Sequence, residues 1–525
     1  MKVTMKKKYI FTIFFSLLFC VVLGLAGYKV FILKEKNISL LDQNYELSKD
    51  RTDEEPLDRP NIVLIHIDSL RADHMGIYGY DKNTTPFLDS MFKKGVIFEN
   101  AIAAAPFSFQ DDAVIFSGLY PSQNNVTDWN KPINKDLNLL PKILSFYGYR
   151  TFAQVSPSLY VDFEMDKSFG TYTMNPYMKN IDQTKFSFAK TLEESKEPFF
   201  GFWHIYDVHL PYFAASAEFY PEKYNGSLSP LSLFFNTSNY QTSESIPTST
   251  SVSSFPWSRQ TKDGLCIDSG NNPDEETCKS YLKIGLADKK YIIASYDTSI
   301  KYTDAQLAQF FDLVKDKPFY RNTLFIISAE HGEDLGEHGL FFHGDIYNNN
   351  IHIPLAIIYP KLSPKRIKEN VSNADIMPTI LTFTNIPLPQ NIEGKDLSTL
   401  IKGEMSGEKR QVFSERAPFD EYTVIKEGWK YIMRDPSKKS SNNKNKELLT
   451  PFMKWVLGSD SKTNSSDELY NLSEDFYEQN NLIGKGYEQE KELQKMLQDF
   501  KNKMWEAKQN QPASSMPPQR IIPYP

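Results

Sequence analysis

The sequence predicts an α/β protein with a parallel sheet flanked by helices, followed by a hairpin-like region near the C-terminal end. Short apolar runs at 61–67 and 323–327 each lead into a loop rich in acidic residues, as buried parallel strands do at their carboxyl ends. Helical and strand-like patterns alternate between these two runs. From about residue 411 the pattern changes to short hairpin-like strands.

The elements after the first strand can be placed by their start and stop residues. Residues 84–95 predict a helix with a capping Thr84 and Pro86 at an early helical position. Residues 105–118 predict a turn and then a helix that begins near Ser108. The later predicted elements are a helix at 139–147, a strand at 151–155, a strand from 199 whose end presents Asp207 and His209, a helix at 287–315, a strand at 353–359, a helix at 375–383, hairpin strands at 412–415 and 423–433, and a last helix at about 487–508.

Two predicted strand ends carry candidate metal ligands. Glu330 and His331 stand side by side after the strand at 323–327, and a carboxylate beside an imidazole is half of a divalent-metal site. Asp68 follows the strand at 61–67 and offers the other half. Because the carboxyl ends of parallel strands meet at one edge of a sheet, we expect these side chains to lie close together. A serine at a helix start, such as Ser108, most often serves as a cap.

The N-terminal segment predicts export. Four lysines among the first eight residues precede an uncharged stretch at 9–28, which is about long enough to cross a bilayer as a helix. We therefore expect a transmembrane signal-anchor at 1–33 and a linker at 34–59, in a single-pass protein whose catalytic part is extracytoplasmic. A cleaved signal peptide, which would leave a secreted protein, is the alternative, because residues 24–26 resemble a cleavage site.

Composition argues against one class of partner. The formal net charge is −7 and the isoelectric point is near 5.8. Binding to a phosphate backbone needs a basic face, so we expect no nucleic-acid partner. Hydrophobic residues make up 40% of the chain, which is ample material for a core.

Six motifs occur in order between about residues 60 and 500. They are NIVLIHIDSLRADHMGIYGY, TTPFLDSMFKKGVIFENAIAAAPFSFQDDAVIFSGLYPS, PFFGFWHIYDVHLPY, EHGEDLGEHGLFFHG, DIMPTILTF and ELYNLSEDFYEQNNLI. Together they resemble the sulfatase family of the alkaline phosphatase superfamily. The resemblance implies an alkaline-phosphatase-like fold, with a mixed, mostly parallel sheet flanked by helices and a small antiparallel C-terminal subdomain. It also implies a catalytic domain at 60–405 with an insertion at 213–286, a C-terminal subdomain at 406–509 and an unstructured tail at 510–525.

The resemblance also implies the site residues. One divalent metal ion, calcium, manganese or zinc, would be held by Asp68, Ser108, Glu330 and His331. Ser108 would be the nucleophile, and His209 would contact the substrate oxyanion or the leaving group. His343 would steady the charge on the transferred group or protonate the leaving oxygen. Arg71, in the DSLRAD run, would be a further catalytic residue.

The chain departs from the family pattern around the nucleophile. Sulfatases carry a cysteine that is oxidised to formylglycine within a Cys-x-Pro-x-Arg run. Here Ser108, Gln110 and Asp112 stand at the Cys, Pro and Arg positions. Asp112 thus places a carboxylate where the family has a cation, and a carboxylate repels an anionic substrate. Glu330 stands where the family has Asp and reaches one methylene further.

These features predict a membrane-anchored, metal-dependent, sulfatase-like hydrolase of sulfate or phosphate esters with a serine nucleophile. A seryl ester has to be resolved by water attack, which makes phosphate esters chemically as reasonable as sulfate esters. The substrate would be a small-molecule, glycan or lipid ester, and the N-terminal helix would contact the membrane. Two alternatives stay open, a transferase that moves a phosphorylated headgroup at the membrane and a sulfatase-fold protein that binds ligands without catalysis.

Overall fold

The chain divides into two units, residues 1–58 and 59–525. The computed structural model describes residues 59–128, 131–156, 164–175, 179–226, 285–404, 409–434 and 467–510, and the backbone of four short strands, β7 (Phe234–Phe235), β8 (Trp257–Thr261), β9 (Gly264–Asp268) and β10 (Tyr281–Leu282). The first unit therefore lies outside the described residues.

The predicted single-pass membrane localisation is corrected. Within the described ranges, no helix is long and apolar enough to cross a membrane. The predicted signal-anchor at 1–33 lies outside these ranges, as do most of the predicted linker at 34–59 and of the tail at 510–525. Spanning a bilayer needs about 20 consecutive apolar residues in a helix, and the described helices do not provide them.

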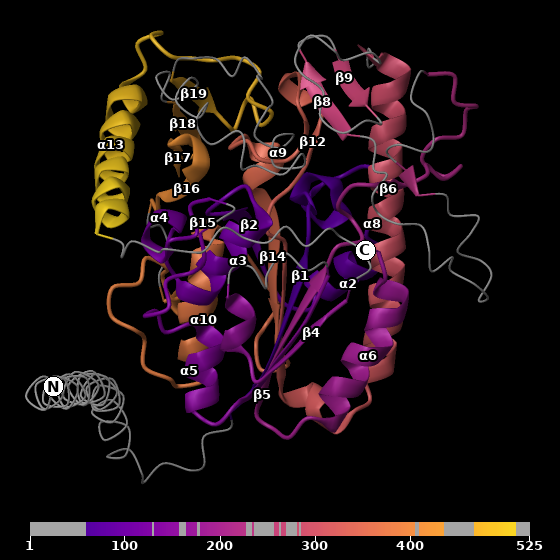
Figure 1. Ribbon diagram of the computed structural model, residues 1–525, viewed down its shortest axis with the longest axis vertical. Helices are drawn as coiled ribbons and strands as arrows, with labels where there is room; N and C mark the ends of the chain where they lie inside the picture. The colour runs from indigo at the N-terminus through magenta and orange to yellow at the C-terminus, as the bar shows by residue number, and fades with distance from the viewer. Residues whose placement is uncertain are drawn as a thin grey trace, which may run out of the picture. The chain divides into compact units, whose positions relative to one another are not determined.

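An eight-stranded sheet forms the centre of the second unit (Figure 1). Its order is β15 (Lys365–Ser372), β2 (Val96–Ile102), β14 (His352–Ile358), β11 (Thr323–Ser328), β1 (Asn61–Ile67), β5 (Phe199–Ile205), β3 (Arg150–Val155), β4 (Thr171–Met174). Strands β1, β3, β4, β5 and β11 run parallel, and so do β2 and β15. Strand β14 is antiparallel to both its neighbours, β11 and β2. The sheet is therefore mixed and mostly parallel, as predicted.

Helices cover both faces of the sheet (Figure 1). One face carries α2 (Pro86–Phe92), α6 (Ile181–Glu194) and α8 (Leu286–Val314), and the other carries α3 (Ser108–Ser117), α5 (Leu140–Phe146) and α10 (Ile376–Phe383). Neighbouring residues of β5 show the alternation of side chains along a strand. The ring of Phe202 lies 5.0 Å from Phe116 of α3. The ring of Trp203 lies 5.0 Å from Phe188 of α6 and 4.8 Å from Phe310 of α8.

The predicted C-terminal subdomain is a four-stranded antiparallel sheet with one long helix packed on it. The sheet has the order β16 (Val412–Arg416), β17 (Glu421–Lys426), β18 (Trp429–Met433), β19 (Glu468–Asn471). Helix α13 (Glu488–Gln509) buries Leu493, Leu497, Phe500 and Met504, which recur every three or four residues on one face. Residues 59–525 form one unit, so the predicted boundary near residue 405 stays a prediction.

The remaining α-helices and strands of the described residues are short. They are helices α4 (Pro121–Asn124), α9 (Asn348–Ile351) and α11 (Ser398–Lys402), and strands β6 (Tyr212–Phe213), β12 (Asp334–Leu335) and β13 (Phe341–Phe342). Within the predicted insertion at 213–286, strands β10, β9 and β8 form a small antiparallel sheet.

Candidate active site

Three of the predicted metal ligands meet from distant segments. Asp68 directly follows β1, Ser108 is the first residue of α3, and His331 lies in the loop after β11. The Ser108 hydroxyl oxygen lies 3.4 Å from Asp68 Oδ2 and 3.0 Å from His331 Nε2. His331 Nε2 lies 3.5 Å from Asp68 Oδ1. Donor atoms that share one ion at about 2 Å lie roughly 3 to 3.5 Å from one another, so this triangle fits a bound cation.

The local sequence explains why Ser108 lies at a helix start. Phe107 precedes the helix in an extended conformation, and its buried ring lies 6.0 Å from the ring of Phe109. The helix ends at Gly118, whose φ of 66° is the left-handed conformation that glycine adopts without strain. The first turn of a helix has unpaired N–H groups and a partial positive charge. This position therefore stabilises negative charge on the Ser108 oxygen.

The fourth predicted ligand, Glu330, contacts two histidines. Glu330 Oε1 lies 2.5 Å from His204 Nε2 and 3.8 Å from His66 Nδ1. One ligand atom each from Asp68, His204 and Glu330 lies within 4.8 Å of the others. Burial and the nearby Asp68 raise the pKa of Glu330 to about 7, against the opposing effect of His204. The carboxylates of Asp68 and Glu330 therefore lie together, as predicted, and the imidazole of His204 contacts both. Neither His204 nor His66 was among the predicted site residues.

Strand register brings these imidazoles to the site. His66 on β1 lies opposite His204 on β5 and opposite Ser328 on β11. Because alternate residues of a strand face the same side, His66 shares a face with Asp68 two positions later. This spacing of two is the signal by which the sequence could have indicated His66.

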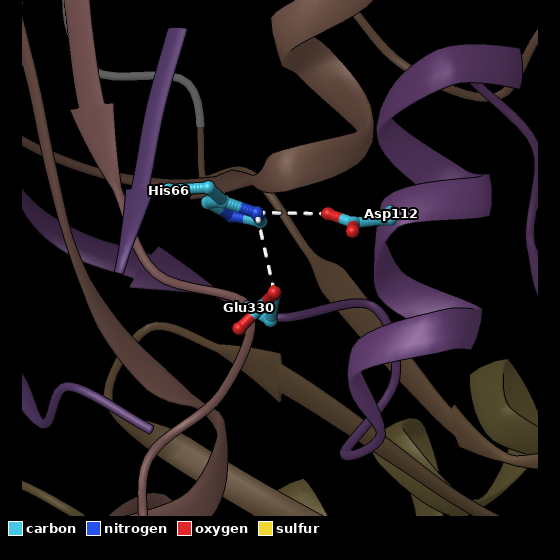
Figure 2. A group of neighbouring side chains, drawn as sticks. All are labelled: His66, Asp112 and Glu330. Atoms are coloured by element: carbon cyan, nitrogen blue, oxygen red, sulfur yellow. Dashed lines mark hydrogen bonds and ion pairs between the residues drawn. The ribbon is translucent and has the colours of Figure 1, made fainter. Parts of the chain in front are cut away.

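Asp112 is paired with His66 (Figure 2). The His66 Nδ1 atom lies 2.8 Å from Asp112 Oδ1, and both side chains are fully buried. Burial lowers the pKa of His66, but the hydrogen bond to Asp112 and the charge of Glu330 raise it above its usual value overall. Asp112, at the position of the family's arginine, is thus hydrogen-bonded to the imidazole of His66 on β1.

His209, His331 and His343 form a cluster of buried imidazoles. The rings of His331 and His343 stack at 4.3 Å, and the ring of His209 meets His343 edge-on at 4.8 Å. His209 Nδ1 lies 2.6 Å from the carbonyl oxygen of Leu210 and therefore carries the proton, while Nε2 lies 3.2 Å from the Tyr206 hydroxyl. Burial lowers the pKa of His209 and His331 to about 3 and that of His343 to about 4. All three imidazoles are therefore neutral near pH 7.

Arg71 lies in a different set of contacts. Its Nε and Nη2 atoms donate to the carboxylate of Asp73, and Nη1 donates to Glu337 and to the carbonyl oxygen of Glu333. The Arg71 guanidinium therefore contacts the carboxylates of Asp73 and Glu337, and the structure shows no contact between it and Ser108. Glu333 itself lies beside the histidine cluster, with Oε1 3.1 Å from His343 Nδ1.

Lys179 is a buried amine near the histidine cluster and was not among the predicted site residues. Its Nζ atom donates to the carbonyl oxygens of Asp207 and His209, at 2.5 and 2.8 Å. Burial lowers the pKa of Lys179 to about 7, although the charges of Asp207 and Asp68 oppose this. Lys179 thereby supports the segment that carries His209. It belongs to no motif, so the sequence contains no signal for it.

The chain is similar to known proteins over more than half of its length. The chain matches the family model described as Sulfatase over residues 60–386. An arylsulfatase of Clostridium perfringens (strain 13 / Type A) is 25% identical over 381 residues, which cover 66% of this chain and 79% of that protein. A Delta 4,5-hexuronate-2-O-sulfatase of Bacteroides thetaiotaomicron is 24% identical over 374 residues, covering 66% of this chain and 73% of that protein.

Solved structures share the fold. The phosphonate monoester hydrolase of Agrobacterium radiobacter aligns with a TM-score of 0.60 and 16% identity, over 86% of this chain and 96% of that chain. A protein in complex with its substrate D-glucosamine-2-N,6-O-disulfate aligns with a TM-score of 0.60 and 19% identity, over 87% of this chain and 100% of that chain. Since the family model spans more than half of the sequence, the resemblance is confirmed: the chain belongs to the sulfatase family of ester hydrolases in the alkaline phosphatase superfamily.

Proposed function

We propose that the chain is a metal-dependent hydrolase of sulfate or phosphate esters in which Ser108 is the nucleophile. The observation that carries this proposal is the triangle of Ser108, Asp68 and His331, with the serine oxygen at a helix N-terminus. These three groups come from separate segments at one edge of the sheet. Convergence of this kind is how α/β enzymes assemble active sites.

The donor atoms of this site suit a divalent cation. A carboxylate, a hydroxyl and an imidazole would hold it, and Glu330 supplies a second carboxylate close to Asp68. A cation bound there would act as a Lewis acid and offset negative charge on the transferred group. Calcium, manganese and zinc all accept such a ligand set.

Ser108 carries the covalent chemistry. Its hydroxyl proton is released, and the oxygen attacks the sulfur or phosphorus in line with the leaving oxygen. The bond from sulfur or phosphorus to the leaving oxygen breaks, and the alcohol departs with a proton. A water molecule then attacks the seryl ester, which releases sulfate or phosphate and restores the hydroxyl.

His343 would stabilise an oxygen that becomes more negative in this reaction, whereas His209 would first take up a proton on Nε2 and then donate it to the leaving oxygen, because its Nδ1 proton is donated to the Leu210 carbonyl. Both are neutral near pH 7, and a neutral imidazole still donates one N–H. Buried donors act strongly because little water screens them. Lys179 would hold the His209 segment in place through its two carbonyl contacts.

The substrate class follows from the nucleophile and the relatives. The curated relatives include an arylsulfatase and a hexuronate 2-O-sulfatase, and the structural neighbours include a phosphonate monoester hydrolase. A plain serine ester must be resolved by water, which suits phosphate as well as sulfate. Small-molecule or glycan esters of either acid are therefore the proposed substrates.

The test uses the purified full chain with aryl sulfate and aryl phosphate esters. Ser108→Ala is expected to lower kcat by at least about 1,000-fold, because it removes the atom that forms the covalent bond. Ser117→Ala, at the opposite end of the same helix, is the matched control and should leave kcat within about threefold. Activity that survives Ser108→Ala on both ester types would exclude the serine from the mechanism.

A further inference from the structure

A second cluster lies beside the proposed catalytic ion, and two of its three residues have no role in the reaction above. It consists of His66, Asp112 and Glu330, and we call it the His66 cluster. Figure 2 shows the three side chains pointing toward one another from β1, from α3 and from the loop after β11. One nitrogen or oxygen atom of each lies within 4.8 Å of the others, and all three side chains are fully buried.

The distances within the His66 cluster suit a shared cation. His66 Nδ1 lies 2.8 Å from Asp112 Oδ1 and 3.8 Å from Glu330 Oε1. Ligand atoms around a tetrahedral zinc at about 2.0 to 2.1 Å are roughly 3.4 Å apart, and the two observed distances bracket that value. A hydrogen bond does not extend to 3.8 Å, so the single Nδ1 proton serves only Asp112.

A buried oxygen without a hydrogen bond points to a missing ligand. Among the described residues, Asp112 Oδ2 is buried with no hydrogen-bond partner, although Oδ1 of the same carboxylate contacts His66. Leaving such atoms unpaired in the interior is costly, and native proteins rarely do so. Two buried carboxylates, those of Asp112 and Glu330, share the single imidazole of His66, and a bound cation would offset this concentration of negative charge.

Glu330 links the two sites. Its Oε1 atom belongs to the His66 cluster, and a Glu330 ligand atom also groups with Asp68 and His204. A glutamate reaches one methylene further than an aspartate, which extends its carboxylate toward His66. We propose that His66, Asp112 and Glu330 bind a second divalent cation of the zinc or manganese type, with Glu330 contacting both ions. An imidazole with two carboxylates favours these metals over calcium. The proposed function needs only one ion, so this inference goes beyond it.

Metal counting tests the inference without reference to activity. The full chain is stripped with a chelator, equilibrated separately with Zn²⁺ and with Mn²⁺, freed of excess metal and measured by elemental mass spectrometry. The wild type should hold two ions, whereas His66→Gln and Asp112→Asn should each hold one. His74→Gln is the matched control, because His74 Nδ1 also lies 2.8 Å from an aspartate, Asp297 Oδ1, and this variant should keep two ions.

The outcomes distinguish a failure of the second metal site from a failure of the proposed function. A wild type that binds one ion, lost in Asp68→Asn, would overturn the second site and leave the proposed function standing. A wild type that binds none would overturn both proposals. Two ions retained in both His66→Gln and Asp112→Asn would place the second ion elsewhere and overturn the assignment. Electron paramagnetic resonance of the Mn²⁺-loaded wild type needs no variant: two neighbouring ions give a coupled spectrum, and an isolated-ion spectrum contradicts the proposal.

Discussion

Replacing Asp345 by asparagine should reduce the free energy of unfolding by about 2 kcal/mol near pH 7. Asp345 follows His343 by two positions and lies 3.1 Å from Arg434 Nη2 and 3.7 Å from Arg416 Nη1. Burial opposes ionisation of Asp345, but the two arginines lower its pKa from 3.8 to about 2. One pKa unit corresponds to about 1.36 kcal/mol, which gives the magnitude of about 2 kcal/mol. Arg416 and Arg434 lie on β16 and directly after β18, so this ion pair joins the active-site loop to the C-terminal sheet.

The stability that Asp345 contributes decreases as the pH is lowered. Because the pKa of Asp345 is lower in the folded state than in the unfolded state, its contribution is fully present above about pH 4 and is lost as the pH falls toward 2. Denaturant unfolding followed by circular dichroism at about pH 7, 5, 4 and 3 measures it. The difference between wild type and Asp345→Asn should be constant from pH 7 to 5 and shrink below pH 4.

The matched control is an exposed ion pair. Asp312 lies 2.6 Å from Lys315 one helical turn away, with both side chains more than half exposed. Solvent screens such a pair, so Asp312→Asn should leave the unfolding curve unchanged. A destabilisation by Asp345→Asn that is equally large at pH 3 and pH 7, or no destabilisation at all, would refute the electrostatic account.

Three further predictions concern the site itself. Chelation should reduce ester hydrolysis to background and readdition of a divalent ion should restore it; full activity after complete metal removal would contradict metal dependence. His209→Gln should lower kcat by roughly 100-fold or more, with a larger loss for esters of poor leaving groups, as a series of substituted aryl esters would measure; an equal loss across the series would exclude a role at the leaving oxygen. Gly344→Ala should lower the thermal midpoint, at a cost of about 1–3 kcal/mol, because φ is +114° and the new Cβ would lie 2.8 Å from the Phe107 ring. Gly339→Ala, at φ +72° with open space around it, is the control and should cost less.

Much of the site could be predicted because its signals are local. An apolar run that ends in Asp68, a second that ends before Glu330 and His331, and a helix that begins at Ser108 are all readable within a few residues. Hydrophobic periodicity and the residues at the ends of an element predict strands and helices, and both signals are contained in short stretches of sequence. The mixed, mostly parallel sheet and the antiparallel C-terminal subdomain were predicted through the family resemblance and are confirmed.

The partners of these residues could not be predicted in the same way. Asp112 was expected to repel an anionic substrate. Its carboxylate is instead hydrogen-bonded to His66, which lies 46 positions earlier in the chain. Arg71 was expected in the catalytic set, and its guanidinium contacts Asp73 and Glu337. Lys179 belongs to no recognisable pattern.

The sequence by itself determined which side chains stand at strand ends and at the start of the nucleophile helix, because burial and backbone periodicity act over a few residues. Only the tertiary structure decided what those side chains contact, because the register of β1 against β5 and β11 sets His66 beside His204 and near Glu330. Register depends on the packing of the whole sheet between its two layers of helices, and a shift of one residue would turn His66 and Asp68 to the opposite face.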